Sequence, residues 1–213
     1  NWMSDPFPYP EKPLARGKVL SAEEVERLGR FERYRDVDGD GVGYRTLPGT
    51  PHPAAGYFTR GSGHNEKAQY SERPGDYVRN MDRLNRKFET LRRKVPGPVV
   101  QEADARDVGI IAYGTSHWAV LESLDQLKQE HGLEAGYCRL RAFPFNDEVK
   151  DFARRHRRVY VVDQNRDAQM CSVLRLALDA EDAKKLRSVR HYNGLPVDAR
   201  TITNSIVSQE VEK

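Results

Sequence analysis

The chain has 213 residues, of which 38% are hydrophobic and 31% are charged, and its 35 basic and 32 acidic residues give a net charge of +3. Charges of both signs are interleaved as on solvated helices, so they give no indication of a nucleic-acid partner. No apolar run approaches the ~18 residues of a membrane span, and no signal peptide is recognisable, so neither a membrane partner nor secretion is expected.

The two cysteines, Cys138 and Cys171, lack the spacing of metal ligands. We interpret them as reduced, half-buried thiols of a cytoplasmic protein rather than as a disulfide or a nucleophile. The length allows one large domain or two small ones. Because the chain begins at Asn1 without an initiator methionine, we expect it to be a piece of something longer.

The first 13 residues contain prolines at positions 6, 8, 10 and 13. Proline excludes a helix and disfavours a central strand, so an extended, polyproline-like backbone is predicted. The interleaved Trp2, Phe7 and Tyr9 are large and apolar, and a disordered tail seldom carries such side chains. We therefore expect the segment to lie on a surface; a recruitment motif for a proline-binding module is the alternative.

A capping box at residues 21–24 predicts a short helix over residues 22–31, and the Asp/Gly-rich segment 36–41 follows it. An EF-hand loop would need an acidic residue at its twelfth position, where Leu47 stands, so calcium binding is not expected. Gly39-Asp40-Gly41 also resembles the start of a thiamine diphosphate and magnesium motif. That motif follows a buried strand and opens a helix, whereas turn residues surround this one. We interpret the segment as a turn whose side chains cap its own backbone.

Residues 46–72 form a long stretch without periodic structure, which is usually functional or ordered by a partner. Gly61 and Gly63 permit a close backbone approach or a positive φ. The polar residues of the stretch suit a phosphate, a carboxylate or a partner chain, and the interface role is favoured. These candidates are His52, Arg60, His64, Asn65, Glu66 and Lys67.

A helix is predicted to start at Pro74 and to end before residues 96–98, Pro-Gly-Pro. Its apolar residues step by four, three, four and three positions, which makes one narrow seam on an otherwise charged helix. A connecting helix that packs on a neighbour has this pattern. The seam consists of Tyr77, Met81, Leu84, Phe88 and Leu91.

Residues 108–169 alternate between strand and helix patterns. Strands are predicted at 108–113, 136–142 and 158–162. One helix lies between the first two and ends at Gly132, and a second begins near Asp147 as its N-cap. Strands and helices that alternate in this way predict parallel strands joined by crossover helices, an open α/β sheet.

Two polar turns follow the first and third of these strands, at residues 114–117 and 163–166. In open α/β sheets, ligands and partners meet the carboxyl ends of the strands. The turns are therefore candidates for a surface that faces an active site or an interface. The candidate residues are Gly114, Thr115, Ser116, His117, Gln164, Asn165 and Arg166.

Helices are predicted at residues 168–176, 179–187 and 198–208, the last with Asp198 as N-cap. The basic run 154–158 suits a solvated helix end, with a phosphate or acidic-partner site as the alternative. The strand at 136–142 has one basic face, with Arg139 and Arg141. It is therefore expected to lie at an edge or to be covered by another chain.

Four motifs in order resemble a known family. They are Tyr-Arg-Thr-Leu-Pro-Gly-Thr at 44–50, Gly-His-Asn-Glu at 63–66, Gly-Ile-Ile-Ala-Tyr-Gly-Thr at 109–115 and Tyr-Val-Val-Asp-Gln-Asn-Arg-Asp-Ala-Gln at 160–169. The set resembles the carboxyl-terminal part of the alpha subunit of 2-oxoacid:ferredoxin oxidoreductases, and most closely the 2-oxoglutarate type. The resemblance extends from Trp2 to Arg200.

The resemblance implies three parts. Residues 1–73 would be the largely irregular tail of a thiamine diphosphate pyrimidine-binding domain, 74–106 a connecting helix and linker, and 107–213 a transketolase C-terminal-like α/β domain. The implied reaction converts 2-oxoglutarate and coenzyme A to succinyl-CoA and reduces ferredoxin. Thiamine diphosphate with magnesium would be shared with a beta subunit, and an iron–sulfur cluster would lie in that partner. The resemblance assigns no catalytic residue here, and the chain would not be active alone.

Two alternatives remain. One is a stand-alone ligand-binding or regulatory α/β module whose pocket is formed by the two polar turns. The other is a relative that acts on pyruvate or a branched-chain 2-oxoacid. The residues that set specificity would lie outside this chain, so its motifs do not separate the second alternative from the 2-oxoglutarate type.

Overall fold

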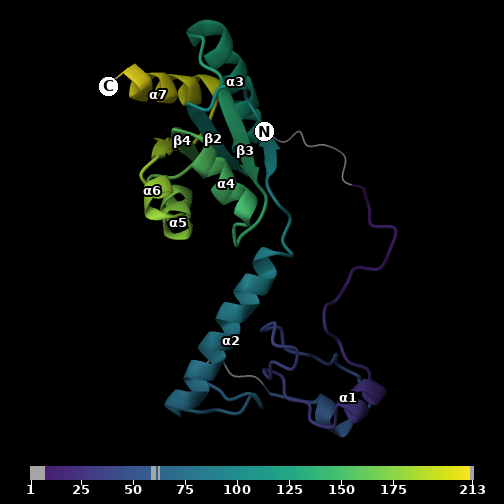
Figure 1. Cartoon of the computed structure of the whole chain (residues 1–213). Helices are drawn as coiled ribbons and strands as arrows, with labels where there is room; N and C mark the ends of the chain where they lie inside the picture. The colour runs from purple at the N-terminus through teal and green to yellow at the C-terminus, as the bar shows by residue number, and fades with distance from the viewer. Residues whose placement is uncertain (1–7, 59–60, 62, 212–213) are drawn as a thin grey trace. The chain divides into compact units, whose positions relative to one another are not determined.

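The structure is a computed structural model that describes residues 8–58, 61 and 63–211. The chain divides into two compact units, one from Asp5 to Lys94 and one from Val95 onward. Figure 1 shows the elements of both, which we describe separately. Trp2, Phe7 and Arg60 lie outside the described residues.

Residues 95–211 form an open sheet of five strands in the order β1-β3-β2-β4-β5. β2, β3, β4 and β5 are parallel, and β1 pairs antiparallel with β3. The predicted class, a mainly parallel α/β sheet, is confirmed. The bounds are β1 Val99–Gln101, β2 Val108–Tyr113, β3 Ala135–Leu140, β4 Arg158–Asp163 and β5 Leu186–Arg190.

Helices cover both faces of this sheet (Figure 1). α3 Ser116–His131 and α7 Ala199–Val211 pack on one face, where Val120, Ile202 and Ile206 are fully buried. α4 Asp147–Arg155 and α5 Gln169–Ala177 cover the other. The central strands β2 and β4 are buried on both faces, which explains why they are continuous apolar runs without alternation.

Three local expectations about this unit were wrong. The predicted helix at 179–187 is only the short α6 Ala180–Ala183, and the chain then pairs with β4 as β5. β3 is not an edge strand, because β1 borders it, and the Arg141 Nε donates to the Gly97 carbonyl at 2.6 Å. The N-cap of α4 is Asn146 rather than Asp147.

The unit from Asp5 to Lys94 is largely irregular and contains α1 Ala22–Leu28, the 3-10 turn η1 Pro53–Ala55 and α2 Pro74–Arg92. The predicted capping box is present, since Glu24 N donates to Ser21 Oγ at 3.2 Å and Ser21 N donates back to the Glu24 carboxylate at 2.8 Å. α1 is shorter than predicted because Gly29, at φ +69°, ends it. Among the described residues, no helix is both long enough and apolar enough to span a bilayer.

Candidate functional site

The two predicted polar turns meet at the carboxyl edge of the sheet. β2 and β4 are adjacent parallel strands, so the turns that follow them lie side by side. The Gln164 amide donates to Thr115 Oγ1 at 3.1 Å and to Ser116 Oγ at 3.0 Å. Its oxygen accepts from Val197 N at 3.2 Å. Gln164 therefore ties the β2 and β4 turns to the segment before α7.

Asp163, the last residue of β4, is fully buried in the same place. Its carboxylate accepts hydrogen bonds from Tyr113 Oη at 3.2 Å and Asn165 Nδ2 at 3.1 Å. The backbone N–H groups of Met170 and Cys171 also donate to it, at 3.1 and 3.2 Å. Those two groups belong to the first turn of α5, whose dipole favours a negative charge. Burial, followed by the Asp163 charge, raises the pKa of Tyr113.

The remaining candidates at this edge have local roles. Gly114, at φ +58°, makes the turn from β2 into α3. The His117 Nδ1 lies 3.1 Å from the Tyr137 hydroxyl of β3, and the two rings are stacked. The Asn165 side-chain oxygen accepts from Asp167 N at 3.2 Å, while the Arg166 Nε pairs with the Asp167 carboxylate at 2.7 Å.

A hollow of about 450 Å³ opens beside Thr115 and Gln164. The loop between β5 and α7 supplies the rest of its wall: His191, Tyr192, Gly194, Leu195 and Pro196. The His191 ring donates from Nε2 to the Leu195 carbonyl at 2.9 Å. No Asp, Glu, Lys or Arg is among the described residues that line this hollow. The wall suits a neutral or apolar group and offers no nucleophile paired with a base.

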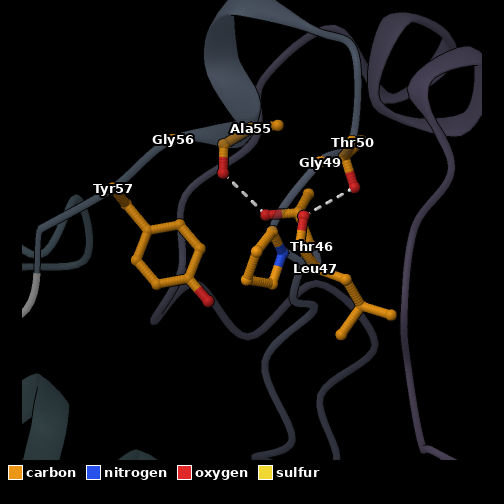
Figure 2. Close-up of a pocket in the computed structure, with 8 residues that line it drawn as sticks. Thr46, Leu47, Gly49, Thr50, Ala55, Gly56 and Tyr57 are labelled. Carbon is orange, nitrogen blue, oxygen red and sulfur yellow. Dashed lines mark hydrogen bonds between the residues drawn. The ribbon is translucent and has the colours of Figure 1, made fainter.

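A second hollow, of about 370 Å³, lies in the unit from Asp5 to Lys94 within the 44–50 motif (Figure 2). Thr46 Oγ1 donates to the Ala55 carbonyl at 2.7 Å, and Thr50 Oγ1 donates to the Leu47 carbonyl at 2.9 Å. Tyr57 forms another part of its wall. Both threonine hydroxyls thus use their protons to hold the loop together.

His52 belongs to this loop and caps η1. Ala54 N donates to its Nδ1 at 3.0 Å, so the Nε2 proton points to the Glu26 carboxylate of α1, 2.8 Å away. The residue joins η1 to α1. His52 was a candidate for a phosphate, a carboxylate or a partner chain, and its contacts in the structure are those of a structural cap.

His64, Asn65 and Glu66 form a different turn. The His64 ring stacks on Tyr34 at 4.0 Å, and Tyr34 N donates to the Glu66 carbonyl at 3.0 Å. The Asn65 side-chain oxygen accepts from Lys67 N at 3.0 Å. These residues shape the segment, in which Glu66 is half-buried and Lys67 is exposed.

The Asp/Gly segment is the self-capping turn that was predicted. Gly41 N donates to the Asp36 carboxylate and Val42 N to the Asp40 carboxylate, both at 2.9 Å. The Lys18 ammonium lies 2.6 Å from Asp38 and 2.7 Å from Asp40, and it lowers the pKa of both carboxyls. The Lys18 ammonium thus occupies the position between Asp38 and Asp40 that a metal cation would need. Within the described residues, no group of three or more His, Cys, Asp or Glu is arranged to hold a metal ion.

The basic run 154–158 is neutralised by acidic side chains. Arg154 and Arg155 pair with Asp151 and Glu102, at 2.7 and 2.8 Å, and Arg158 pairs with Glu210. These charges are thus already compensated, so the phosphate-site alternative has no structural support. Both cysteines are buried and unpaired, and burial raises the pKa of the Cys138 thiol to about 12, so neither is a reactive thiolate.

No family model matches the sequence. The structure is similar to the 2-oxoglutarate:ferredoxin oxidoreductase from Magnetococcus marinus with 2-oxoglutarate, coenzyme A and succinyl-CoA bound, with a TM-score of 0.69 and 22% identity. The chain has the fold of part of this oxidoreductase. The match covers 84% of this chain and 30% of that chain, so the present chain spans less than a third of its neighbour.

A second structure found is the alpha chain of a probable 2-oxoacid ferredoxin oxidoreductase from Thermoplasma acidophilum. It shares 24% identity at a TM-score of 0.35, over 55% of this chain and 98% of that chain. The resemblance expected from the sequence motifs is thus confirmed at the level of fold by the Magnetococcus structure.

Proposed function

We propose that this chain is part of the alpha subunit of a 2-oxoglutarate:ferredoxin oxidoreductase. One observation carries the proposal: the fold similarity covers 84% of the chain. Residues 95–213 are little more than half of the chain, so the similarity must include much of the irregular unit that precedes them. A similarity that reflected only a widespread α/β domain would not extend over that irregular unit.

The reaction would be the oxidative decarboxylation of 2-oxoglutarate. The bond between its carboxylate and keto carbon breaks and releases CO₂, the remaining acyl group joins the coenzyme A thiol as succinyl-CoA, and ferredoxin takes the electrons. Thiamine diphosphate supplies the carbanion chemistry in such reactions. In line with the resemblance of the sequence motifs, we assign the thiamine diphosphate–magnesium site, shared with this subunit, and the iron–sulfur cluster to a partner beta subunit.

The contribution of this chain would be to shape and cover the site. Its polar turns at the carboxyl edge, with Thr115, His117 and Gln164, are our candidates for the surface that faces the active site or the beta subunit. The sheet beneath them is rigid because β2 and β4 are buried on both faces. Such a scaffold holds its edge loops in fixed positions.

The test is to tag the alpha subunit that contains this chain, co-express it with a candidate beta subunit and purify the complex. We expect bound thiamine diphosphate and a dye reduction that requires both 2-oxoglutarate and coenzyme A. Pyruvate and 2-oxoisovalerate, offered in parallel, test the relatives with other substrates. A complex that reduces the dye with none of the three acids, or two chains that do not associate, would contradict the proposal.

The second candidate function is a stand-alone ligand-binding module, and the hollow beside Thr115, Gln164 and His191 favours it. Such a module would be monodisperse alone and would bind a small ligand without any partner. A thermal-shift screen of neutral metabolites against the purified chain distinguishes the two. Stabilisation that the substitution Gln164→Ala removes would support the module.

A further inference from the structure

The helix α2 is attached to its own unit by a polar face. Its buried residues are Asn80, Arg83 and Thr90. The Asn80 amide donates to the His64 carbonyl at 2.7 Å, and Arg83 donates to the Gly41 carbonyl at 3.1 Å. Thr90 Oγ1 donates to the Asp40 carbonyl at 2.7 Å. Side-chain hydrogen bonds to loop carbonyls, rather than apolar packing, therefore hold α2 in its unit.

The absence of a side chain at Gly41 lets its loop lie directly against the backbone of α2. Gly41 has φ +77°, and a Cβ there would lie 2.3 Å from the backbone nitrogen of Lys87 in α2. The Arg86 guanidinium adds an ion pair with Asp36 at 2.9 Å on the same side. The orientation of α2 about its own axis is consequently fixed within the unit.

The apolar seam of α2 is left exposed. Tyr77 is 62% exposed and Phe88 47%, and Met81 and Leu91 are also exposed, while Leu84 is half-buried. An ordinary amphipathic helix buries its apolar face and exposes its polar face, and α2 does the reverse. Five large apolar side chains in one line form a patch of the kind that marks an interaction site.

The spacing of the seam residues indicates which kind of secondary structure could cover them. Steps of four and three positions repeat every seven residues, which is the pattern by which one helix packs lengthwise against another. At its amino-terminal end the seam borders a hollow of about 540 Å³, which Tyr77 and Val78 line together with Tyr70, Glu72 and Pro74. A covering helix would therefore find apolar side chains along the seam and a partly apolar hollow beyond its first residue.

Charge specifies the kind of helix. The residues that flank a seven-residue seam on its two sides set the choice of partner. Here none of them is acidic, and within α2 two are cations, Lys87 and Arg92; Lys94 follows just beyond the end of the helix. The other flanking residues are Val78, Asn85 and Asn80, of which Asn80 is buried against the loop.

The acids of this stretch, Asp82 and Glu89, lie one position farther around the helix, and Glu89 pairs with Arg92 at 3.2 Å. If two copies of α2 packed together, parallel or antiparallel, Lys87 of one copy would face only cationic or neutral flanking residues of the other. This lack of opposite charge disfavours self-pairing. A partner with carboxylates beside its own seam would complement these positions.

We propose that the Tyr77–Leu91 seam of α2 docks an amphipathic α-helix of a partner protein, one with apolar residues at the same seven-residue repeat and carboxylates at the flanking positions. This docking surface does not depend on the reaction proposed above, because it rests on α2 and the loops that hold it.

The experiment uses two synthetic helical peptides as probes. Both carry leucine at the seam positions; one has glutamate at the flanking positions and the other lysine. Fluorescence anisotropy with the full chain should show binding of the glutamate peptide, weakened by salt, and binding of the lysine peptide about tenfold weaker or less. Lys87→Glu should reduce this preference.

Seam variants supply the control. Phe88→Asp and Leu91→Asp should abolish binding of the glutamate peptide, while Leu176→Asp should not, because Leu176 is 89% exposed on α5 and outside the seam. Thermal melts show that each variant is folded, and Lys87→Glu tests the surface without touching an apolar residue.

Four outcomes would overturn the proposal. They are no binding of either peptide, equal binding of both, a dimer of the chain alone that Phe88→Asp dissociates, and seam residues protected from hydroxyl-radical labelling in the monomeric chain. The third outcome would mean that a second copy of the chain covers the seam. The fourth would mean that another part of the same chain covers it.

Discussion

Asp163 shows why a buried charge is tolerated at the end of β4. Four donors, two of them backbone N–H groups of α5, surround its carboxylate. Removing the acceptor leaves these donors without this partner, and each donor that water cannot reach then costs about 1–3 kcal/mol. The residue is thus the link between β4, β2 and α5 rather than a catalytic group.

We expect Asp163→Ala to lower the free energy of unfolding by about 3 kcal/mol, since several donors lose their acceptor together. Asp163→Asn should cost less, because one acceptor oxygen remains. Urea unfolding followed by circular dichroism measures both. The control is Asp167→Ala, whose carboxylate pairs with Arg166 at the surface and should contribute within about 0.5 kcal/mol. Equal losses at the two positions would contradict this account.

His156 is a buried imidazole that lies against the backbone of two strands. A Cβ on Gly136 would lie 2.7 Å from its Nε2, and Gly109 also leaves space for the ring. Its Nδ1 proton is donated to the Phe152 carbonyl at 2.7 Å, whereas Nε2 has no hydrogen-bond partner. Burial lowers the pKa of His156, and Arg106 and Arg155 act in the same direction, while the hydrogen bond to the Phe152 carbonyl and Glu102 oppose them.

The sign of the pH dependence follows from this lowered pKa. In the unfolded chain a histidine titrates near pH 6.5, so the unfolded state gains a proton first as the pH falls. The stability that neutral His156 provides is therefore complete above about pH 6.5 and is lost as the pH falls through the folded pKa, by up to ~1.4 kcal/mol per pH unit. Urea unfolding across this range should be steeper for the native chain than for His156→Gln.

At the scale of elements, one ionic contact fixes α7 on the sheet. Arg158 of β4 binds Glu210 with its Nη2 at 2.6 Å from the carboxylate, and the buried Tyr160 hydroxyl donates to the same group at 2.6 Å. The side chains of Arg158 and Glu210 are only 12% and 15% exposed. Burial, followed by the hydrogen bond to Glu210, raises the pKa of Tyr160.

We expect Glu210→Ala to cost about 3 kcal/mol, because it leaves a mostly buried guanidinium and a buried hydroxyl without their acceptor. Glu130→Ala is the matched control: Glu130 of α3 also reaches α7, through Arg200, but both side chains are nearly half exposed and the pair should contribute within about 1 kcal/mol. Chemical denaturation compares the two. If Glu130→Ala were the more harmful, burial would not be the deciding factor.

The elements also show what the sequence could predict. β2 and β4 were predictable as uninterrupted apolar runs, and Gly132 as the end of α3, because each depends on local chemistry. β5 was missed because Leu186-Arg-Ser-Val-Arg has little alternation and becomes a strand only by pairing with β4. β1 follows a Pro-Gly-Pro segment and is likewise defined by its partner strand. The meeting of Thr115 and Gln164 depends on β2 and β4 being neighbours in the sheet. Two of the four donors to Asp163 are backbone N–H groups of α5, which no motif encodes.

At the scale of the whole molecule, the two units are stabilised in different ways. Residues 95–211 bury apolar side chains on both faces of a sheet. In the other unit, the apolar residues that are buried within its described part are Leu20, Val25, Ala55 and Ala68. Hydrophobic burial dominates the stability of domains, so the two units should differ widely in stability.

We therefore expect residues 95–213, expressed alone, to unfold cooperatively at nearly the same urea concentration as in the full chain. Residues 8–94 should exchange their amide hydrogens much faster than β2 and β4, because loop hydrogen bonds and few apolar contacts hold them. Hydrogen exchange by mass spectrometry measures both units in the intact chain. Uniform protection across both units would mean that residues 8–94 are stabilised by contacts other than those described.

Addition of the glutamate-flanked peptide should slow exchange in α2 and in the loops around Gly41 and His64 that hold it, but not in the sheet. If exchange slowed only in the sheet, the peptide would bind somewhere other than α2.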